Sequence, residues 1–198
     1  DGRDDLFIGI PGKAHFGWED AGAVHIVRGN ASGLGANDQL ISQDGIVGNN
    51  NVSMGDISEV TEEGDRFGES LAVGDFNNDG FDDVTISAPE EDHNGFNSAG
   101  RLHVLQGTAS GIDNENEKLI DQTDNGIPTD PQNGSRFGHS LAVGRIYGSD
   151  YDDLLIGLPF QDEAITDNIT HANAGAAMLL RGTSSGSSQF GTKQFVKQ

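Results

Sequence analysis

The chain has 198 residues, with 29 glycines, no cysteine, and 32 acidic against 11 basic side chains, which give a formal net charge of −21. This much negative charge repels nucleic acid and anionic membrane surfaces and excludes both as partners. The lack of cysteine excludes disulfides, thiol catalysis and cysteine-bound zinc, and since no apolar run has membrane-spanning length we expect no membrane insertion.

The chain repeats one long unit, which first appears midway through a copy in residues 1–33 and then returns in residues 64–111 and 134–186. The later copies share R-F-G-x-S-L-A-V-G, a D-D pair, an apolar run ending in Pro, an A-G pair and G-T-x-S-G, and their phenylalanines Phe67 and Phe137 are 70 residues apart. A period of this length fits one four-stranded propeller blade with long loops. The pattern predicts a partial blade in 1–60, a blade in 61–130 and a blade in 131–198.

Within the middle copy we expect strands near 70–75, 83–88, 101–106 and 117–121. The second strand reads VTISAP there, FIGIPG in the first copy and LLIGLP in the third. Short apolar runs bounded by Gly and Pro are typical of inner strands that are buried on both faces. The polar segments 44–63 and 121–135 are predicted to be loops between blades, and no long amphipathic helix is visible. The fold class is therefore predicted to be all-β.

A nine-residue loop in the middle copy has oxygen-bearing side chains at alternating positions around a glycine. Its candidate calcium ligands are Asp75, Asn77, Asp79 and Asp83, with the backbone carbonyl of Phe81. Carboxylate, amide and carbonyl oxygens are hard ligands that suit Ca²⁺, and Gly80 permits the tight turn. The loop is not an EF-hand, because Ile86 stands where that motif needs Glu. The alternative is a metal-free Asn/Asp-rich turn.

The other copies of this loop differ in their ligand positions. In the third copy Arg145, Tyr147 and Ser149 stand in place of Asp75, Asn77 and Asp79. Asp150 stands in place of Gly80, and only Asp153 survives as the counterpart of Asp83. We hypothesise that Arg145 replaces calcium electrostatically and that this copy binds no metal. In the first copy a partial site is possible at Asp1, Arg3 (through its backbone carbonyl) and Asp5.

Two pairs of a dipeptide and a later tripeptide, with the tripeptide of a third, point to a known family. Phe67-Gly68 is followed by Ser87-Ala88-Pro89, Phe137-Gly138 by Gly157-Leu158-Pro159, and Gly9-Ile10-Pro11 is the tail of a third match. The pattern resembles the FG-GAP repeat of integrin α-subunit head domains and their bacterial relatives, and we expect a bacterial source. Phe16-Gly17 follows Gly-Ile-Pro and is interpreted as a coincidence.

The resemblance implies a fragment of a seven-bladed β-propeller at the cell surface or outside the cell, in which calcium is structural. It implies a non-enzymatic module for adhesion or for binding an extracellular protein or glycan, with ligand residues unknown. One alternative is a non-catalytic propeller appended to a secreted hydrolase such as a phospholipase. Another is a structural unit that self-associates to close its ring, because an open blade edge invites pairing.

Several further residues have simple structural interpretations. His25 and His103 align with Met178, so we expect packing positions and not ligands. His93 lies among Glu90, Glu91 and Asp92, and the sequence favours a solvated hairpin there, although 90–98 remains a candidate binding loop. Trp18 is the only tryptophan and either contacts a ligand or packs on a blade.

Overall fold

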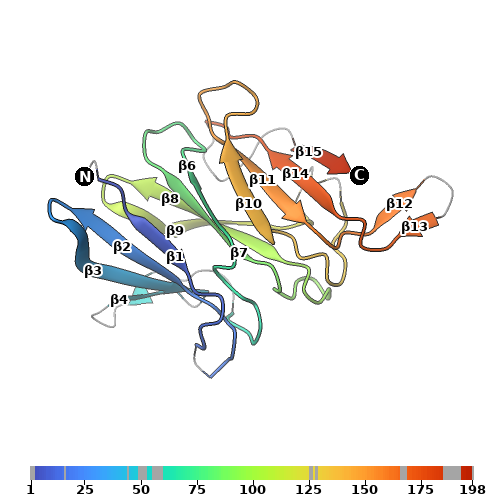
Figure 1. Ribbon diagram of the computed structural model, residues 1–198, viewed down its shortest axis with the longest axis horizontal. Coiled ribbons are helices and arrows are strands. Elements are labelled where there is room, and N and C mark those ends of the chain that lie inside the picture. Colours follow the sequence, from blue (N-terminus) through green and yellow to red (C-terminus); the bar gives the residue numbers. More distant parts are fainter. Residues whose placement is uncertain are drawn as a thin grey trace.

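The computed structural model describes residues 3–15, 17–43, 45–48, 53–54, 60–124, 127, 129–165, 169–184 and 193–197. Within these ranges the chain forms β-strands and turns and contains no helix, as the sequence predicts. Three main antiparallel sheets lie side by side in chain order, with the two chain ends toward opposite sides of the molecule (Figure 1).

The second sheet comes from the middle copy. It contains β6 (Leu71–Gly74), β7 (Asp83–Ala88), β8 (Arg101–Thr108) and β9 (Gly111–Ile120) in that spatial order. The first three strands match their predicted positions. The fourth begins six residues earlier than predicted, because a tight turn joins it to β8, where the Thr108 hydroxyl donates to the Gly111 carbonyl at 2.7 Å.

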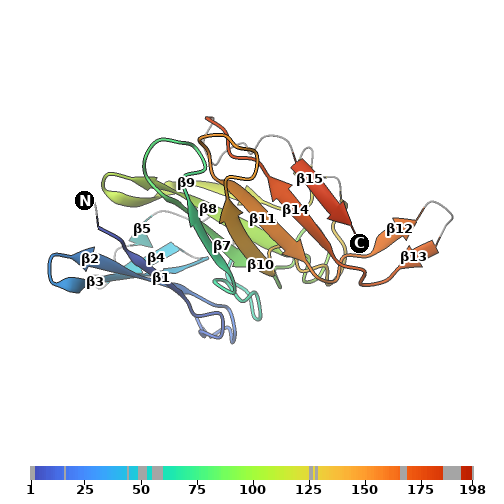
Figure 2. The same cartoon turned by 45° about the horizontal axis from the view of Figure 1, so that its top comes forward.

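The third sheet repeats this plan with an insertion. It contains β10 (Ser140–Gly144), β11 (Asp153–Leu158), β14 (Ala176–Leu180) and β15 (Lys193–Lys197) in that spatial order. Between its second and third strands, β12 (Glu163–Ile165) and β13 (Ile169–His171) form a separate hairpin. This hairpin projects away from the sheet, at the right of Figures 1 and 2.

The first sheet contains β1 (Leu6–Gly9), β2 (Val24–Asn30), β3 (Gly33–Ser42), β4 (Gly45–Gly48) and β5 (Ser53–Met54). The prediction that 44–63 is only a loop is wrong, because β4 pairs with β3 and β5 pairs with β4. Ile46 and Val47 are β-branched strand formers, but the flanking glycines and asparagines obscured them. β1 is the counterpart of β7 and β11, and in the described part of the chain it has β2 as its single strand neighbour.

Adjacent sheets bury apolar side chains between them. Phe67, Val24, Ile41 and Ile86 belong to the core shared by the first two sheets, whereas Phe137, Leu102 and Ile156 belong to the core shared by the second and third. Each of these seven side chains is at most 2% exposed. The sheets therefore stack face to face, and the strand order and stacking are those of propeller blades.

The Phe-Gly dipeptides join neighbouring sheets through the backbone. The Phe67 N–H donates to the Ala21 carbonyl at 3.0 Å, and the Phe137 N–H donates to the Ala99 carbonyl at 2.9 Å. Each acceptor precedes a glycine in the left-handed region, and a Cβ on Gly100 would lie 2.4 Å from the Phe137 carbonyl oxygen. The repeated A-G pair therefore makes room for the R-F-G segment of the next sheet.

Candidate metal site

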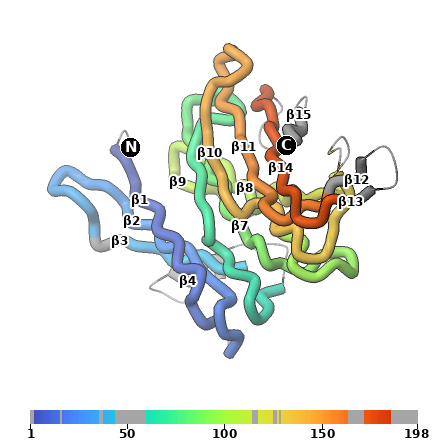
Figure 3. The backbone as a smooth tube through the Cα atoms, turned by 45° about the vertical axis from the view of Figure 1, so that its right-hand side comes forward, coloured from blue at the N-terminus to red at the C-terminus, as the bar shows by residue number. Residues whose placement is uncertain are grey.

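The 75–83 loop joins β6 to β7 at one end of the sheets. It lies beside the loop that joins β10 to β11 in the third sheet (Figures 1 and 3). Asp152 links the two loops, since its Oδ2 accepts the Asp75 N–H at 3.0 Å and its own N–H donates to the Asp75 carbonyl at 3.0 Å. The neighbouring sheet thereby fixes the first residue of the candidate site.

The predicted ligands Asp75, Asn77 and Asp79 lie in one tight turn, which they hold through hydrogen bonds. The Asp79 N–H donates to Asp75 Oδ1 and Asn77 Oδ1, and the Gly80 N–H donates to Asp75 Oδ2 at 3.0 Å. Asn77 Nδ2 donates to Asp79 Oδ2 at 2.8 Å. In this arrangement the described residues contain no group of three His, Cys, Asp or Glu side chains already placed to hold a metal ion.

Asp83 differs from the other loop carboxylates because it is fully buried. Its Oδ1 accepts the Gly107 N–H at 2.9 Å, while its buried Oδ2 has no hydrogen bond of normal geometry. Burial raises the pKa of Asp83 to about 6; the Gly107 and Phe76 N–H groups act in the opposite direction, and the charges of Asp79 and Asp75 raise it further. An unsatisfied buried carboxylate oxygen is costly, and a bound cation would satisfy it.

Asp153 is the counterpart of Asp83 in the third sheet, and both of its buried carboxylate oxygens accept hydrogen bonds. Its Oδ1 accepts the Gly182 N–H at 3.2 Å, and its Oδ2 accepts the N–H groups of Ile146 and Tyr147 at 2.8 and 2.9 Å. The Arg145 guanidinium donates to Asp152 Oδ1 at 3.0 Å, so its charge lies next to Asp153, and the hypothesis that it replaces calcium electrostatically stays a prediction. The hydrogen bonds to Asp153 itself come from backbone N–H groups.

The partial site of the first copy is described only in part. Asp1 lies outside the described residues, and Arg3 and Asp5 are exposed. Asp5 Oδ1 accepts the Gly29 N–H at 2.9 Å, as Asp83 and Asp153 do with their own glycines. The last aspartate of each loop therefore secures the end of the third strand. Sequence analysis missed this role, although the Asp and the closing Gly recur in all three copies.

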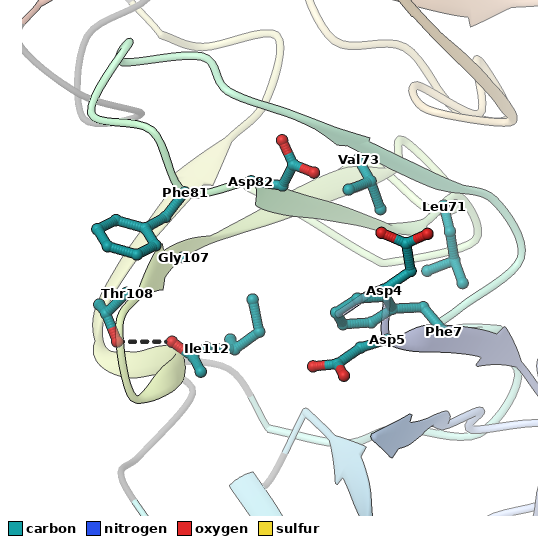
Figure 4. A pocket seen from close by; sticks show the side chains of 11 residues that line it. Asp4, Asp5, Phe7, Leu71, Val73, Phe81, Asp82, Gly107, Thr108 and Ile112 are labelled. Carbon is teal, nitrogen blue, oxygen red and sulfur yellow. Dashed lines mark hydrogen bonds between the residues drawn. The ribbon is translucent and has the colours of Figure 1, made fainter. Parts of the chain in front are cut away.

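A pocket of about 540 Å³ lies between β1 and β6, close to the 75–83 loop (Figure 4). Phe7, Leu71 and Val73 supply apolar lining, and Asp4, Asp5 and Asp82 supply carboxylates. Burial raises the pKa of Asp82, and the charges of Asp75, Asp152 and Asp4 raise it further. The sequence did not predict this pocket.

Two matching loops lie between the second and third blade strands, away from the aspartate loops. Residues 11–22 and 89–100 correspond at a spacing of 78 residues, and His15 bridges to Trp18 as His93 bridges to Phe96. The prediction of a solvated hairpin holds for Asp92, Asn94, Gly95 and Asn97, which are exposed, but not for His93, whose Nε2 lies 3.0 Å from Asp121 Oδ2 and whose side chain is only 15% exposed. This histidine tethers the candidate binding loop 90–98 to the end of β9.

The aligned histidines also have carboxylate partners. His103 Nδ1 lies 2.6 Å from Glu117 Oε1, and His25 Nε2 lies 2.7 Å from Asp38 Oδ2. His103 and Met178 are fully buried, so the expectation of packing positions holds for them, but the pairing with the outer strand was not foreseen. Trp18 is 46% exposed, which fits a contact role better than blade packing.

Residues 67–105 match the FG-GAP repeat family. The chain is 28% identical over 160 residues to the phosphatidylinositol-glycan-specific phospholipase D of Bos taurus, which covers 81% of this chain and 17% of that protein. The mouse (Mus musculus) enzyme of the same name is 34% identical over 111 residues, covering 56% of this chain and 12% of that protein.

Integrin alpha-4 of Xenopus laevis is 30% identical over 168 residues, covering 83% of this chain and 14% of the integrin. The chain therefore spans only a small part of each of these relatives, all of which are animal proteins. They lend no support to the expected bacterial source. The matching repeat, together with the stacked antiparallel sheets, shows that the chain is an FG-GAP repeat protein built of β-propeller blades.

Proposed function

We propose that this chain is a calcium-stabilised β-propeller module for adhesion or for binding an extracellular protein or glycan. The side chains of Asp75, Asn77, Asp79 and Asp83 and the backbone carbonyl of Phe81 would hold the ion. The observation that carries the calcium proposal is the buried Oδ2 of Asp83, which lacks a normal hydrogen bond while the same atom of Asp153 accepts two. Bound calcium would supply positive charge to neighbouring carboxylates that otherwise repel one another.

Calcium that binds only the folded state stabilises it by mass action. The gain is about 2.7 kcal/mol when free calcium is 100 times Kd. For a chain of this size this corresponds to a rise of roughly 5–11 °C in Tm, at 2–4 °C per kcal/mol.

The test compares thermal unfolding in excess calcium and in chelator for the parent chain, Asp79→Ala and Asp150→Ala. Asp150 is an exposed acid in the third-sheet loop and serves as the matched control. We expect the Tm difference to vanish in Asp79→Ala and to persist in Asp150→Ala. No difference in the parent chain, or an equal difference in Asp79→Ala, would refute the site.

The placement outside the cell and the binding role are supported by similarity to integrin alpha subunits. The loops 11–22 and 90–98 are the proposed ligand surface, because exposed aromatic residues such as Trp18 are typical of contact surfaces. Among the described residues, no helix is long and apolar enough to cross a membrane. A glycan array and a cell-binding assay with Trp18→Ala as the negative variant test this role. If Trp18→Ala kept every binding event of the parent chain, Trp18 would be excluded as a contact residue.

A second candidate function is a non-catalytic propeller attached to a secreted hydrolase. Similarity to phosphatidylinositol-glycan-specific phospholipase D in several mammals favours it. The chain covers at most 17% of those proteins, so their activity is not transferred to it. Incubation of the purified chain with a glycan-anchored reporter is expected to release nothing. Release would overturn the proposal that this module is non-catalytic, and the coding sequence on either side would identify a neighbouring domain.

Self-association is a further proposal for the same fold. β1 pairs with β2 alone in the described part of the chain, and Leu6 and Ile8 on this strand are 42% and 40% exposed. Apolar side chains on an edge strand favour association with another surface. Sedimentation velocity tests this proposal, and a purely monomeric chain at high concentration would exclude it.

A further inference from the structure

The contact between the first and second sheets and the contact between the second and third each contain a buried polar pair at corresponding positions. Gln122 lies just after β9, and its Nε2 donates to Gln161 Oε1 of the third sheet at 2.7 Å. Gln43 lies just after β3, and its Nε2 donates to Glu91 Oε2 of the second sheet at 2.6 Å. All four side chains are at most 4% exposed. Glu91 thus occupies the place that a neutral amide occupies in the second contact.

A second position differs in the same direction. Ser135 in G-S-R-F-G donates its hydroxyl to Gln122 Oε1 at 2.8 Å, so that the glutamine is satisfied at both ends. Asp65 in G-D-R-F-G is its counterpart and is 2% exposed. An ionised carboxylate only accepts hydrogen bonds. Gln43 Oε1 is correspondingly buried without a hydrogen bond.

We propose that Gln43, Glu91 and Asp65 form a proton-dependent joint between the first two sheets. The joint is firm when both carboxyl groups carry protons and loosens when they ionise. Protonated Glu91 is close in shape and charge to glutamine, and protonated Asp65 can donate as Ser135 does. With both groups protonated, the first contact becomes as neutral as the second. With both ionised, two negative charges share a buried site that contains an unsatisfied oxygen.

The surroundings of both carboxyl groups favour the neutral form. Burial raises the pKa of Glu91 to about 8; the charge of Asp65 adds to this effect, and the Gln43 amide opposes it. Burial also raises the pKa of Asp65 to about 6, whereas the Glu62 backbone N–H, which donates to Asp65 Oδ2 at 2.6 Å, opposes this.

The other charged groups around the joint are mostly acidic. The charges of Glu62 and Asp92 raise both pKa values, and His103 on β8 lowers that of Asp65. Two arginines beside these residues pair with other carboxylates: Arg66, which follows Asp65 in the chain, pairs with Glu69 at 2.8 Å, and Arg136 pairs with Glu90, which precedes Glu91, at 2.7 Å. On the first sheet, His15 lies 3.1 Å from Ser42 Oγ, next to Gln43.

The direction of the pH effect follows from these shifts. The ordinary values are 4.5 for Glu91 and 3.8 for Asp65, so the folded chain binds both protons more tightly than the unfolded chain. The stabilisation is fully present below these ordinary values. The Asp65 part is lost as pH rises toward about 6 and the Glu91 part as pH rises toward about 8.

The experiment follows urea unfolding of the full chain from pH 5 to pH 9 for the parent, Glu91→Gln and the double variant with Asp65→Ser. Ionisation of Glu91 alone raises the unfolding equilibrium constant by up to about tenfold per pH unit between its two pKa values. We expect Glu91→Gln to remove this rise and the double variant to flatten the profile further. All variants keep the 75–83 loop, so the titration of its carboxylates contributes equally to each profile and cancels when the variants are compared.

Gln161→Glu provides the reverse test, because it places a carboxyl group in the neutral second contact. We expect it to introduce a new loss of stability with rising pH. Hydrogen exchange of the first sheet at pH 5 and pH 9 locates the effect in the parent chain. A parent-to-Glu91→Gln difference that stays constant within about twofold over this pH range would overturn the proposal. So would a Gln161→Glu profile parallel to that of the parent.

Discussion

Substitution of Gly100 by alanine tests the contact between the second and third sheets. Gly100 has φ +85°, and an added Cβ would lie 2.4 Å from the Phe137 carbonyl oxygen and 2.6 Å from its nitrogen. Both are backbone atoms, so no side-chain rotation can relieve the overlap. Gly95 is the matched control, since it has φ +84° in the same loop and nothing lies within 4 Å of its added Cβ.

Both variants place an alanine in the left-handed backbone region, but only Gly100→Ala also makes a Cβ overlap backbone atoms of Phe137. An L-residue in the left-handed region costs about 1–2 kcal/mol, which is the expected effect of Gly95→Ala. At Gly100, overpacking adds about 1–3 kcal/mol and weakening of the hydrogen bond from Phe137 to Ala99 adds about 1 kcal/mol. The total for Gly100→Ala is about 3–6 kcal/mol, or a fall in Tm of roughly 6–24 °C against 2–8 °C for Gly95→Ala.

Urea and thermal unfolding of both variants measure these differences at fixed pH and calcium. Hydrogen exchange at Phe137 and in β10 adds a local measurement, because separation of the sheets exposes the amide that donates to Ala99. Equal destabilisation of the two variants would refute the steric role of the A-G pair. Unchanged exchange at Phe137 in Gly100→Ala would refute it independently.

Two further predictions concern the third-sheet loop. Asp153→Asn removes the negative charge on which three backbone N–H groups converge, so we expect a loss of about 1.5–3 kcal/mol of unfolding free energy that is the same in calcium and in chelator. Asp83→Asn, by contrast, is expected to abolish only the calcium-dependent part of the unfolding free energy. An effect of Asp153→Asn that depends on calcium would contradict this assignment. Arg145→Ala removes a partly exposed ion pair with Asp152 and is expected to change the unfolding free energy by less than about 1 kcal/mol in urea titrations. A loss of several kcal/mol would instead favour the hypothesis that Arg145 takes the place of an ion.

The repeated segments made much of the fold predictable. β6, β7 and the start of β8 lie where their short apolar runs and flanking Gly and Pro place them, because burial on both faces leaves a strong local pattern. β4 and β5 were missed, because Ile46 and Val47 are set among polar and glycine residues. Their pairing with β3 is decided by the neighbouring strand and not by local sequence.

The candidate site was predictable in its residues but not in its contacts. Alternating oxygens mark the 75–83 loop, yet only the structure shows that one oxygen of Asp83 is committed to Gly107 and the other is buried without a normal hydrogen bond. The Phe16-Gly17 dipeptide was interpreted as a coincidence, and Phe16 itself lies outside the described residues. The correspondence of its loop with 89–100 at a spacing of 78 residues could have been found by aligning His15 with His93. Contacts such as Gln43 to Glu91 join distant segments, and no local pattern reveals them.

The recurring aspartate at the end of each loop also bears on how such repeats diverge. One of its oxygens always holds the third strand, so the residue stays useful to the sheet whether or not an ion is nearby. In Asp153 the other oxygen accepts a pair of amide N–H groups, whereas in the proposed calcium site the same oxygen of Asp83 would bind a cation. On that proposal, a blade would gain or lose an ion through substitutions at a few loop positions while its strands stay in register. Sensitivity to calcium would then be set separately in each blade.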